Sequence, residues 1–171
     1  VVPVFSEGEA LPQLHRRVSE AMKCVGMPFE LIFIDDGSTD RSLEVALELR
    51  QVDGNIRVLE FSRNFGHQMA IAAGLDYARG EAVITMDGDL QHPPELIPEL
   101  VRKWQEGYDV VFTCRQSTAG TGPLKNFASR LFYAIINCLS EVSIPPGAAD
   151  FRLLDRKVVE VFRTLGEQAL F

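Results

Sequence analysis

Two aspartates, Asp87 and Asp89, follow directly on the apolar run 82–86 and are separated by a single glycine. A short apolar run of this kind predicts a buried strand, so the two carboxylates lie where that strand ends. Mg²⁺ and Mn²⁺ prefer oxygen ligands and usually take only one or two carboxylates from a protein, leaving their other positions to substrate phosphates and water. The spacing therefore predicts a site for a divalent cation and a diphosphate, to which Gln91 adds a neutral oxygen ligand.

Three further polar loops follow strand-like runs, at residues 6–9, 35–40 and 62–67. In open parallel sheets, ligands bind beyond the carboxyl ends of the strands. We therefore expect the four loops to gather on one edge of a sheet and to form a site. The loop 35–40 has a second interpretation, because Asp, Gly, Ser and Thr are also the residues that tight turns and helix caps favour.

Histidines and cations near these loops have two interpretations each. His67 follows Gly66 at the start of a helical pattern, where it either faces a phosphate or caps the helix. His92 is either a turn residue or hydrogen-bond donor beside the metal site, or a metal ligand itself, and the first is favoured because a hard cation next to diphosphate prefers oxygen ligands to imidazole. Each of four cationic side chains is explained, taken alone, as a solvated surface charge. Together they are candidates for a cationic clamp that binds phosphate oxygens: Arg115, Lys125, Arg130 and Arg152.

The elements that must position these residues alternate along the chain. Strand-like runs cover residues 1–5, 29–34, 56–61, 82–86 and 110–114, and apolar residues step by three and four between several of them. This alternation predicts an α/β domain with a mostly parallel sheet and helices on both faces. The polar connection at about 115–125 is expected to be mobile. The apolar helical pattern at 127–139 predicts a helix that packs on the sheet or touches lipid.

Length and charge narrow the class of protein. The 171 residues fit a single domain, 1–171, that buries about 70% of its unfolded surface. A net charge of −7 argues against a nucleic-acid partner, whose binding face would be basic. No window reaches the roughly 18 consecutive apolar residues of a membrane span, so we expect a soluble fragment. Both ends lie in apolar runs, which predicts a catalytic domain truncated at each end.

Five segments resemble, in order, the motifs of family-two glycosyltransferases of the GT-A type. V-P-V-F-S-E at 2–7 resembles V-P-x-Y-N-E, I-D-D-G-S-T-D at 34–40 resembles D-D-G-S-x-D, and R-N-F-G-H at 63–67 resembles R-N-x-G-x. D-G-D-L-Q-H-P-P-E at 87–95 resembles D-A-D-L-Q-x-P-P-E, and D-F-R-L-L-D-R at 150–156 resembles D-F-R-L-x-x-R. The similarity is to the branch that includes dolichol-phosphate mannose synthases and bacterial polyprenyl-phosphate glycosyltransferases.

The resemblance implies a GT-A fold and a metal-dependent, inverting transfer of a sugar from a nucleoside diphosphate sugar to a polyprenyl (undecaprenyl or dolichyl) phosphate. It implies that the reaction occurs at the cytoplasmic face of a membrane, with the membrane reached through a carboxyl-terminal segment beyond this chain. The sugar, the base (UDP or GDP), the acceptor length and the oligomeric state stay open.

The resemblance also implies a role for each site residue. It implies that the nucleotide is held by Pro3, Phe5, Glu7, Ile34, Asp36, Asp87 and Gly88. It implies that Mg²⁺ or Mn²⁺ is bound by Asp87, Asp89 and Gln91, and that acceptor or donor phosphates are bound by Arg115, Lys125 and Arg130. The residues that it makes candidates for catalysis are Asp89, Asp150 and Arg152.

Three residues depart from the family pattern, and three other classes of protein stay open as alternatives. Phe5, Ser6 and Gly88 stand where Tyr, Asn and Ala are usual, and none of these changes removes a charge. Alternative classes are a phosphohydrolase that forms an aspartyl-phosphate, a phospho-accepting receiver, and a domain that binds a nucleotide sugar without turnover. The hydrolase motif continues with Thr or Val after its second Asp, whereas Leu90 follows Asp89 here.

Overall fold

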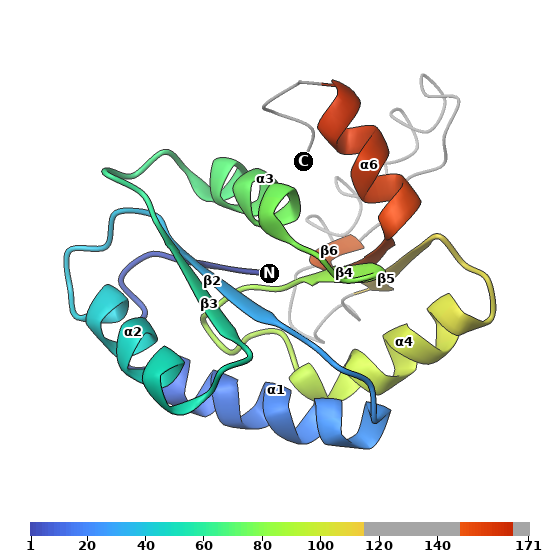
Figure 1. Cartoon of the computed structure of the whole chain (residues 1–171), viewed down its shortest axis with the longest axis horizontal. Coiled ribbons are helices and arrows are strands. Elements are labelled where there is room, and N and C mark those ends of the chain that lie inside the picture. Colours follow the sequence, from blue (N-terminus) through green and yellow to red (C-terminus); the bar gives the residue numbers. More distant parts are fainter. Residues whose placement is uncertain (115–147, 166–171) are drawn as a thin grey trace, which may run out of the picture. The chain divides into compact units, whose positions relative to one another are not determined.

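The structure is a computed structural model that describes residues 1–114 and 148–165 (Figure 1). Contacts divide the chain into two compact units, Val1–Val111 with Phe151–Phe171, and Phe112–Asp150. Both cavities considered below lie in the first unit. The elements are β1 (Val2–Val4), α1 (Leu11–Val25), β2 (Leu31–Asp35), α2 (Ser42–Val52), β3 (Ile56–Glu60), α3 (His67–Tyr77), β4 (Ala82–Thr85), the 3₁₀ turn η1 (Pro94–Leu96), α4 (Ile97–Gln105), β5 (Val110–Cys114), β6 (Ala148–Asp155) and α6 (Arg156–Leu165).

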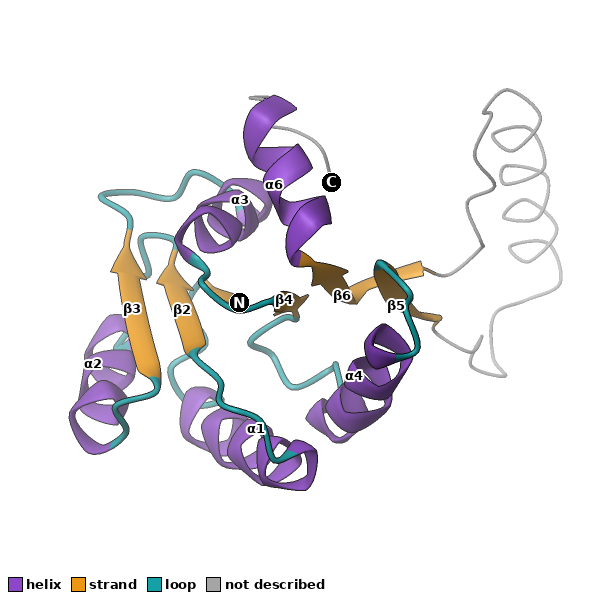
Figure 2. Ribbon diagram, turned by 45° about the vertical axis from the view of Figure 1, so that its right-hand side comes forward, coloured by secondary structure: helices purple, strands orange, loops and turns teal. Residues whose placement is uncertain are grey.

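The strands form two three-stranded groups that meet at β1 and β4. β1, β2 and β3 are parallel and adjacent in that order, and the second group has the order β4-β6-β5, with β6 antiparallel to β4. The Val1 nitrogen donates to the Ile84 carbonyl at 2.8 Å, and the Met86 nitrogen donates to the Val1 carbonyl at 3.1 Å. These bonds connect β1 to β4, so the strands follow one another as β3-β2-β1-β4-β6-β5 (Figure 2).

Helices cover both faces of this arrangement, with α1, α2 and α4 on one side and α3 and α6 on the other (Figure 1). Alternate residues of β2 serve the two sides: Phe33 packs in a cluster with residues of α1 and α4, whereas Ile32 and Ile34 pack with residues of α3 and α6. Every residue of β2 is buried as a result, which is typical of a parallel strand inside an α/β fold. With both faces covered, polar chemistry is restricted to the ends of the strands.

The helix α1 illustrates how the sequence forms these layers. Its buried stripe repeats at helical spacing and consists of Leu11, Leu14, Val18 and Ala21. Pro12 lies in the first turn, where a missing N–H costs no helical hydrogen bond. Gly26 ends the helix with φ 70°, and its N–H donates to the Met22 carbonyl at 3.0 Å.

The expected α/β class with a mostly parallel sheet is confirmed, and the five expected strands correspond to β1–β5. The sequence did not predict β6, the antiparallel strand between β4 and β5. The connection expected at 115–125 and the apolar helix expected at 127–139 lie outside the described residues. Across the ranges 1–114 and 148–165, no helix is both long and apolar enough to cross a membrane.

Candidate functional site

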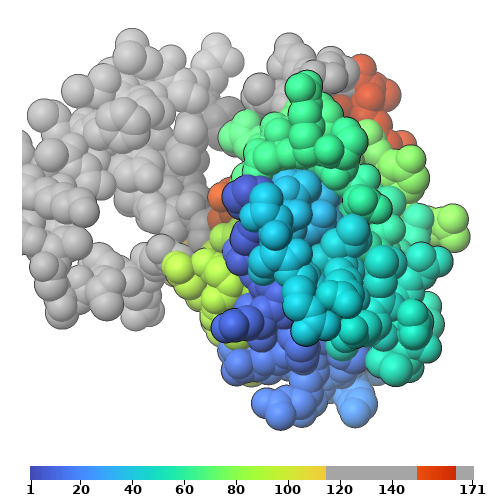
Figure 3. Space-filling model, turned by 90° about the vertical axis from the view of Figure 1, so that its left-hand side faces the viewer, coloured from blue at the N-terminus to red at the C-terminus, as the bar shows by residue number. Residues whose placement is uncertain are grey.

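A cavity of about 290 Å³ opens at the carboxyl ends of the parallel strands. It draws residues from the loops after β1, β2, β3 and β4, which adjoin as the dark blue, light blue, green and yellow-green segments of the face in Figure 3. The lining residues are Pro3, Val4, Phe5, Glu7, Asp36, Asn64, Gly66, His67, Asp87, Gly88 and Asp89. The two aspartates after β4 thus share one cavity with residues of the other three loops.

The loop after β1 is held in place by the start of α2. The Glu7 N–H donates to Ser42 Oγ at 2.9 Å, and the Gly8 N–H donates to Asp40 Oδ2 at 3.2 Å. Ser6 has φ 58°, a left-handed conformation that turns the chain sharply after the strand. Together these features fix the backbone from which the Glu7 side chain lines the cavity.

Asp36 joins the loop after β2 to the loop after β3. Its Oδ1 accepts the Phe65 N–H at 2.7 Å and its Oδ2 accepts the Gly66 N–H at 3.0 Å, while the side chain is buried. Beside it, Gly37 has φ 68°, and a Cβ there would lie 2.5 Å from the Arg63 carbonyl carbon. The second loop therefore supports the third at van der Waals distance, and Asp36 faces the cavity with both oxygens already bonded to backbone.

The acidic centre of the cavity consists of Glu7, Asp87 and Asp89. Glu7 Oε2 and Asp87 Oδ1 are buried and have no hydrogen-bond partner in the described chain. A Cβ at Gly88 would lie 2.1 Å from Glu7 Oε2, so the glycine leaves the space that the Glu7 carboxyl fills. Burial first, and then the charges of Asp89, Asp87 and Asp40, raise the pKa of Glu7 to about 7.

These residues fit a divalent cation that a substrate helps to hold. The described residues contain no cluster of three or more His, Cys, Asp and Glu side chains that could hold a metal by themselves. Asp87 nevertheless offers a buried oxygen that accepts no hydrogen bond from the described residues, and Asp89 lies exposed at the mouth with one oxygen accepting the Gln91 N–H at 2.9 Å. Two carboxylates with open positions for phosphate and water are the usual protein share of a Mg²⁺ or Mn²⁺ site.

His92 contacts the candidate metal ligand Asp87 from below. Its Nδ1 accepts the Asp87 N–H at 3.1 Å, so in this arrangement the ring proton lies on Nε2. The ring is buried and stacks on Phe151, with centroids 5.5 Å apart and planes 23° from parallel. His92 is therefore a residue of the loop after β4 that contacts Asp87, and towards the Asp87 backbone its Nδ1 is an acceptor and not a donor.

The loop after β3 brings Asn64, Gly66 and His67 to the cavity, three residues to which the sequence assigned no definite role. His67 begins α3, and its Nε2 lies 3.6 Å from Asp87 Oδ1. Because the first N–H groups of a helix are unbonded and carry partial positive charge, this end of α3 suits an anion. The signal in the sequence was the resemblance of residues 63–67 to R-N-x-G-x.

Of four other residues implied for nucleotide binding and catalysis, two line the cavity and two do not. Pro3 and Phe5 line the cavity, and Phe5 is 48% exposed. Ile34 is fully buried in the core cluster on the α3 side and does not line the cavity, so only its backbone can serve a ligand. Arg152 lies on β6 opposite Thr85 and is likewise not among the lining residues.

Besides Ile34, Gln91 and Arg152, which do not line the cavity, four further candidate residues are not placed in it. Asp150 is exposed and belongs to the second compact unit, Phe112–Asp150. Arg115, Lys125 and Arg130 lie outside the described residues. The cationic clamp on phosphate therefore stays a prediction from the sequence.

Curated relatives that match the whole of this chain include two glycosyltransferases. The chain is 43% identical over 171 residues to the uncharacterized glycosyltransferase sll0501 of Synechocystis sp., matching all of this chain and 54% of the relative. It is 42% identical over 171 residues to the bactoprenol glucosyl transferase of Shigella phage SfV, matching all of this chain and 56% of that protein. The chain thus spans about half the length of these relatives.

A solved structure shares the fold. The glucosyl-3-phosphoglycerate synthase of Mycobacterium tuberculosis, crystallised with Mn²⁺, UDP and phosphoglyceric acid, superposes with a TM-score of 0.61 at 22% identity, covering 91% of this chain and 54% of that one. This likeness shows a GT-A fold, as the sequence led us to expect. The family model described as glycosyl transferase family 2 matches residues 1–162, and the chain belongs to that family.

Proposed function

We propose that this chain is the catalytic domain of an inverting glycosyltransferase that moves a sugar from a nucleoside diphosphate sugar to a polyprenyl phosphate, with Mg²⁺ or Mn²⁺ as cofactor. The observation that carries the proposal is the acidic cavity at the carboxyl ends of β1 and β4, where one buried oxygen each of Glu7 and Asp87 accepts no hydrogen bond from the described residues. The acceptor is proposed from the relatives named bactoprenol glucosyl transferase. Family membership favours this function over a phosphohydrolase or a receiver.

In this proposal, Asp87 and Asp89 hold the cation, and Gln91 assists them from the next turn of the loop. When bound, the cation neutralises the charge of the leaving diphosphate. The amino end of α3 at His67 offers N–H groups to the same phosphates, and Gly88 gives the Glu7 carboxyl its position beside them. Pro3, Phe5, Asp36 and the backbone of Ile34 belong to the nucleotide end of the pocket.

The acceptor explains why this chain presents carboxylates and cations instead of a strong base. A phosphomonoester has its second pKa near 6 and is largely dianionic at neutral pH, so its oxygen can displace the diphosphate without help from a general base. We propose that Arg115, Lys125, Arg130 and Arg152 bind acceptor or donor phosphates, and that Asp150 orients Arg152 or the acceptor. The lipid acceptor places the reaction at a membrane surface, for which we propose the cytoplasmic face.

The decisive experiment measures donor binding and transfer separately. The purified chain is tested by thermal unfolding with UDP, GDP and their sugars, each with and without Mn²⁺ or Mg²⁺, and then incubated with radiolabelled donor and a short polyprenyl phosphate. A donor at about 100 times its Kd stabilises the folded state by about 2.7 kcal/mol, which is roughly 5–10 °C for a chain of this size. The proposal fails if no nucleotide raises the unfolding temperature in the presence of either metal.

Asp89→Asn tests the metal ligand directly. Because the amide is uncharged, we expect the variant to lose the Mn²⁺-dependent part of the shift with nucleotide while unfolding at the wild-type temperature without ligand. Asp76→Asn is the matched control, since Asp76 is an exposed residue of α3 whose Oδ1 lies 3.7 Å from Arg163 Nε. A titration of Asp89→Asn with Mn²⁺ and nucleotide that matches wild type would remove Asp89 from the site.

A further inference from the structure

A single histidine closes the loop between β4 and the turn η1. His92 Nδ1 accepts the N–H of Asp87, five residues earlier in the chain, at 3.1 Å. Between them, Leu90 has φ 65°, a left-handed conformation that costs free energy in any residue with a side chain. A strained backbone of this kind persists only where the surrounding contacts hold it. The bond from the Asp87 N–H to His92 is such a contact, because it spans the strained residue.

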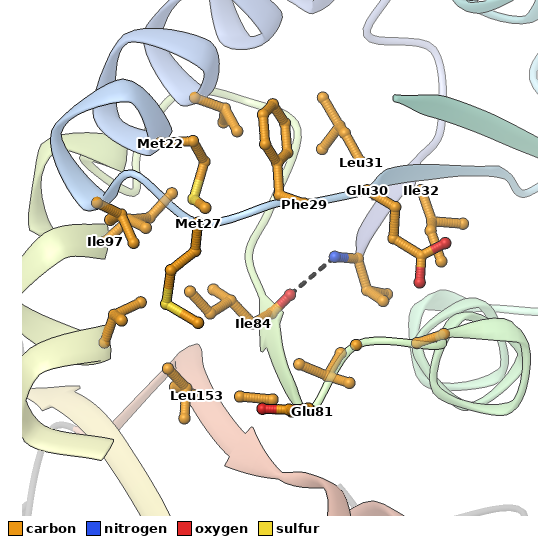
Figure 4. A pocket seen from close by; sticks show the side chains of 18 of the residues that line it. Met22, Met27, Phe29, Glu30, Leu31, Ile32, Glu81, Ile84, Ile97 and Leu153 are labelled. Carbon is orange, nitrogen blue, oxygen red and sulfur yellow. Dashed lines mark hydrogen bonds between the residues drawn. The ribbon is translucent and has the colours of Figure 1, made fainter. Parts of the chain in front are cut away.

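The face of the same imidazole rests on β6. His92 is 5% exposed and stacks on the fully buried ring of Phe151. Phe151 and Leu153 lie on one face of β6 and belong to one core cluster. Leu153 borders a second cavity, of about 430 Å³, together with Ile97 of α4 (Figure 4), whereas Phe151 does not line that cavity. The imidazole therefore has a closely packed support, and its edge is fixed relative to Asp87.

The imidazole also lies against the carboxylate that we assign to the cation. His92 Nδ1 is 3.4 Å from Asp87 Oδ2, so the ring occupies that side of the carboxylate. The other oxygen, Oδ1, is buried and accepts no hydrogen bond from the described residues. Asp89, in the same loop, accepts the Gln91 N–H at 2.9 Å. Both carboxylates are therefore carried by the loop whose shape the His92 bond maintains.

We propose that His92 is a positioning residue for the cation: its bond to the Asp87 N–H holds the carboxylates of Asp87 and Asp89 in place before the cation binds. That N–H lies between two buried residues, Met86 and Gly88. Without an acceptor there, the backbone would have to turn until the N–H reached water, and the carboxylate would turn with it. The inference rests on the proposed function, which assigns the cation to Asp87 and Asp89, and it adds a residue that is not itself a ligand.

Two substitutions separate the acceptor from the ring. His92→Asn puts an amide oxygen where Nδ1 stands, so it keeps an acceptor for the Asp87 N–H but loses the stack on Phe151. His92→Phe keeps a stacking ring but has no acceptor. We expect His92→Phe to unfold at the higher temperature of the two, yet to bind Mn²⁺ in the presence of nucleotide about 10–100-fold more weakly than wild type. His92→Asn should unfold at the lower temperature and bind Mn²⁺ nearly as wild type does. A role in stability alone predicts the opposite order of affinities.

Two measurements on each protein make the test. Mn²⁺ is titrated calorimetrically in the presence of the nucleotide that most raises the unfolding temperature of wild type, and amide exchange with D₂O is followed by NMR without metal. In His92→Phe the Asp87 amide should exchange at least about tenfold faster than in wild type, whereas in His92→Asn it should stay slow. His15→Phe is the matched control, because His15 bonds Asp53 Oδ2 at 2.8 Å and does not line the site cavity. It should leave the affinity for Mn²⁺ unchanged.

Three results would overturn the role of His92. They are a wild-type Kd for Mn²⁺ in His92→Phe, an affinity for Mn²⁺ that follows the unfolding temperature through the series, and equally fast exchange of the Asp87 amide in wild type and His92→Phe. A wild-type chain that binds neither Mn²⁺ nor nucleotide would instead contradict the proposed function, and with it the cation that His92 serves. Binding by wild type that His92→Phe matches would leave the proposed function intact and remove His92 alone.

Discussion

At the scale of single residues, the cavity holds acidic groups closer together than their charges favour. Burial and the neighbouring Asp89 and Asp87 raise the pKa of Glu7 from 4.5 to about 7. A pKa raised by folding favours the protonated form of the folded protein. The stability that Glu7 contributes is therefore complete below its unfolded pKa near 4.5 and is lost as the pH rises through 7.

Glu7→Gln should remove this pH dependence. Because glutamine carries no charge, we expect the variant to have a higher free energy of unfolding than wild type at pH 8, by about 1 kcal/mol after allowance for solvent screening, and a smaller difference at pH 5. Urea unfolding at both pH values in the absence of metal measures the change. Glu99→Gln on the exposed side of α4 is the control. Parallel pH profiles for wild type and Glu7→Gln would contradict the prediction.

At the scale of elements, Gly37 and Gly88 have different roles. Gly37 lets two loops pack together, whereas Gly88 leaves room for a side chain of the site. A Cβ at Gly37 would meet the backbone of Arg63 and Asn64 at 2.5–2.6 Å, and φ there is 68°. A Cβ at Gly88 would meet the far end of the flexible Glu7 side chain instead. Backbone cannot move aside as a carboxyl group can.

Gly37→Ala and Gly88→Ala should therefore differ sharply. We expect Gly37→Ala to cost about 2–4 kcal/mol of unfolding free energy, because it adds left-handed strain and pushes apart the loops after β2 and β3. Gly88→Ala should cost about 1 kcal/mol or less, while moving the Glu7 carboxyl and so changing the apparent affinity for Mn²⁺ with nucleotide. Chemical unfolding and metal titration of both variants provide the comparison, and equal losses of stability would refute it.

The sequence predicted those helices and strands that are marked by an apolar pattern within a short stretch of neighbouring residues. β1–β5 are short apolar runs, and α1 carries a regular buried stripe, so period and composition were sufficient. β6 was not predicted, because its charged residues Asp150 and Arg152 interrupt the apolar pattern and its pairing with β4 bridges about 70 residues of sequence. The contact of His92 with the Asp87 backbone was not predictable either, since a tight loop through Leu90 at φ 65° creates it.

At the scale of the whole molecule, the two ends of the parallel strands have different roles. Helices cover both faces of the strands, so binding groups collect at the carboxyl ends, and the amino ends carry packing and ion pairs. Glu30, just before β2, accepts from Arg57 Nη1 at 2.8 Å and from the Arg79 N–H at 2.6 Å. Burial raises the pKa of Glu30, but the bonds from Arg57 and Arg79 outweigh it and leave the pKa below 4.5.

Glu30→Gln tests this division. A pKa lowered by folding means that the stability from Glu30 is present above about pH 4.5 and is lost as the pH falls through the lowered value. We expect the variant to lose about 1 kcal/mol of unfolding free energy at pH 7, and the difference from wild type to shrink in acid. Its Kd for nucleotide with Mn²⁺ should equal that of wild type, because the mutated side chain lies at the other end of the strands from Asp87 and Asp89. Asp89→Asn should do the reverse, losing metal-dependent binding without losing stability. A Glu30→Gln protein that folds stably but binds nucleotide more weakly would show that the two ends of the sheet are coupled, and the separation of stability from binding would have to be abandoned.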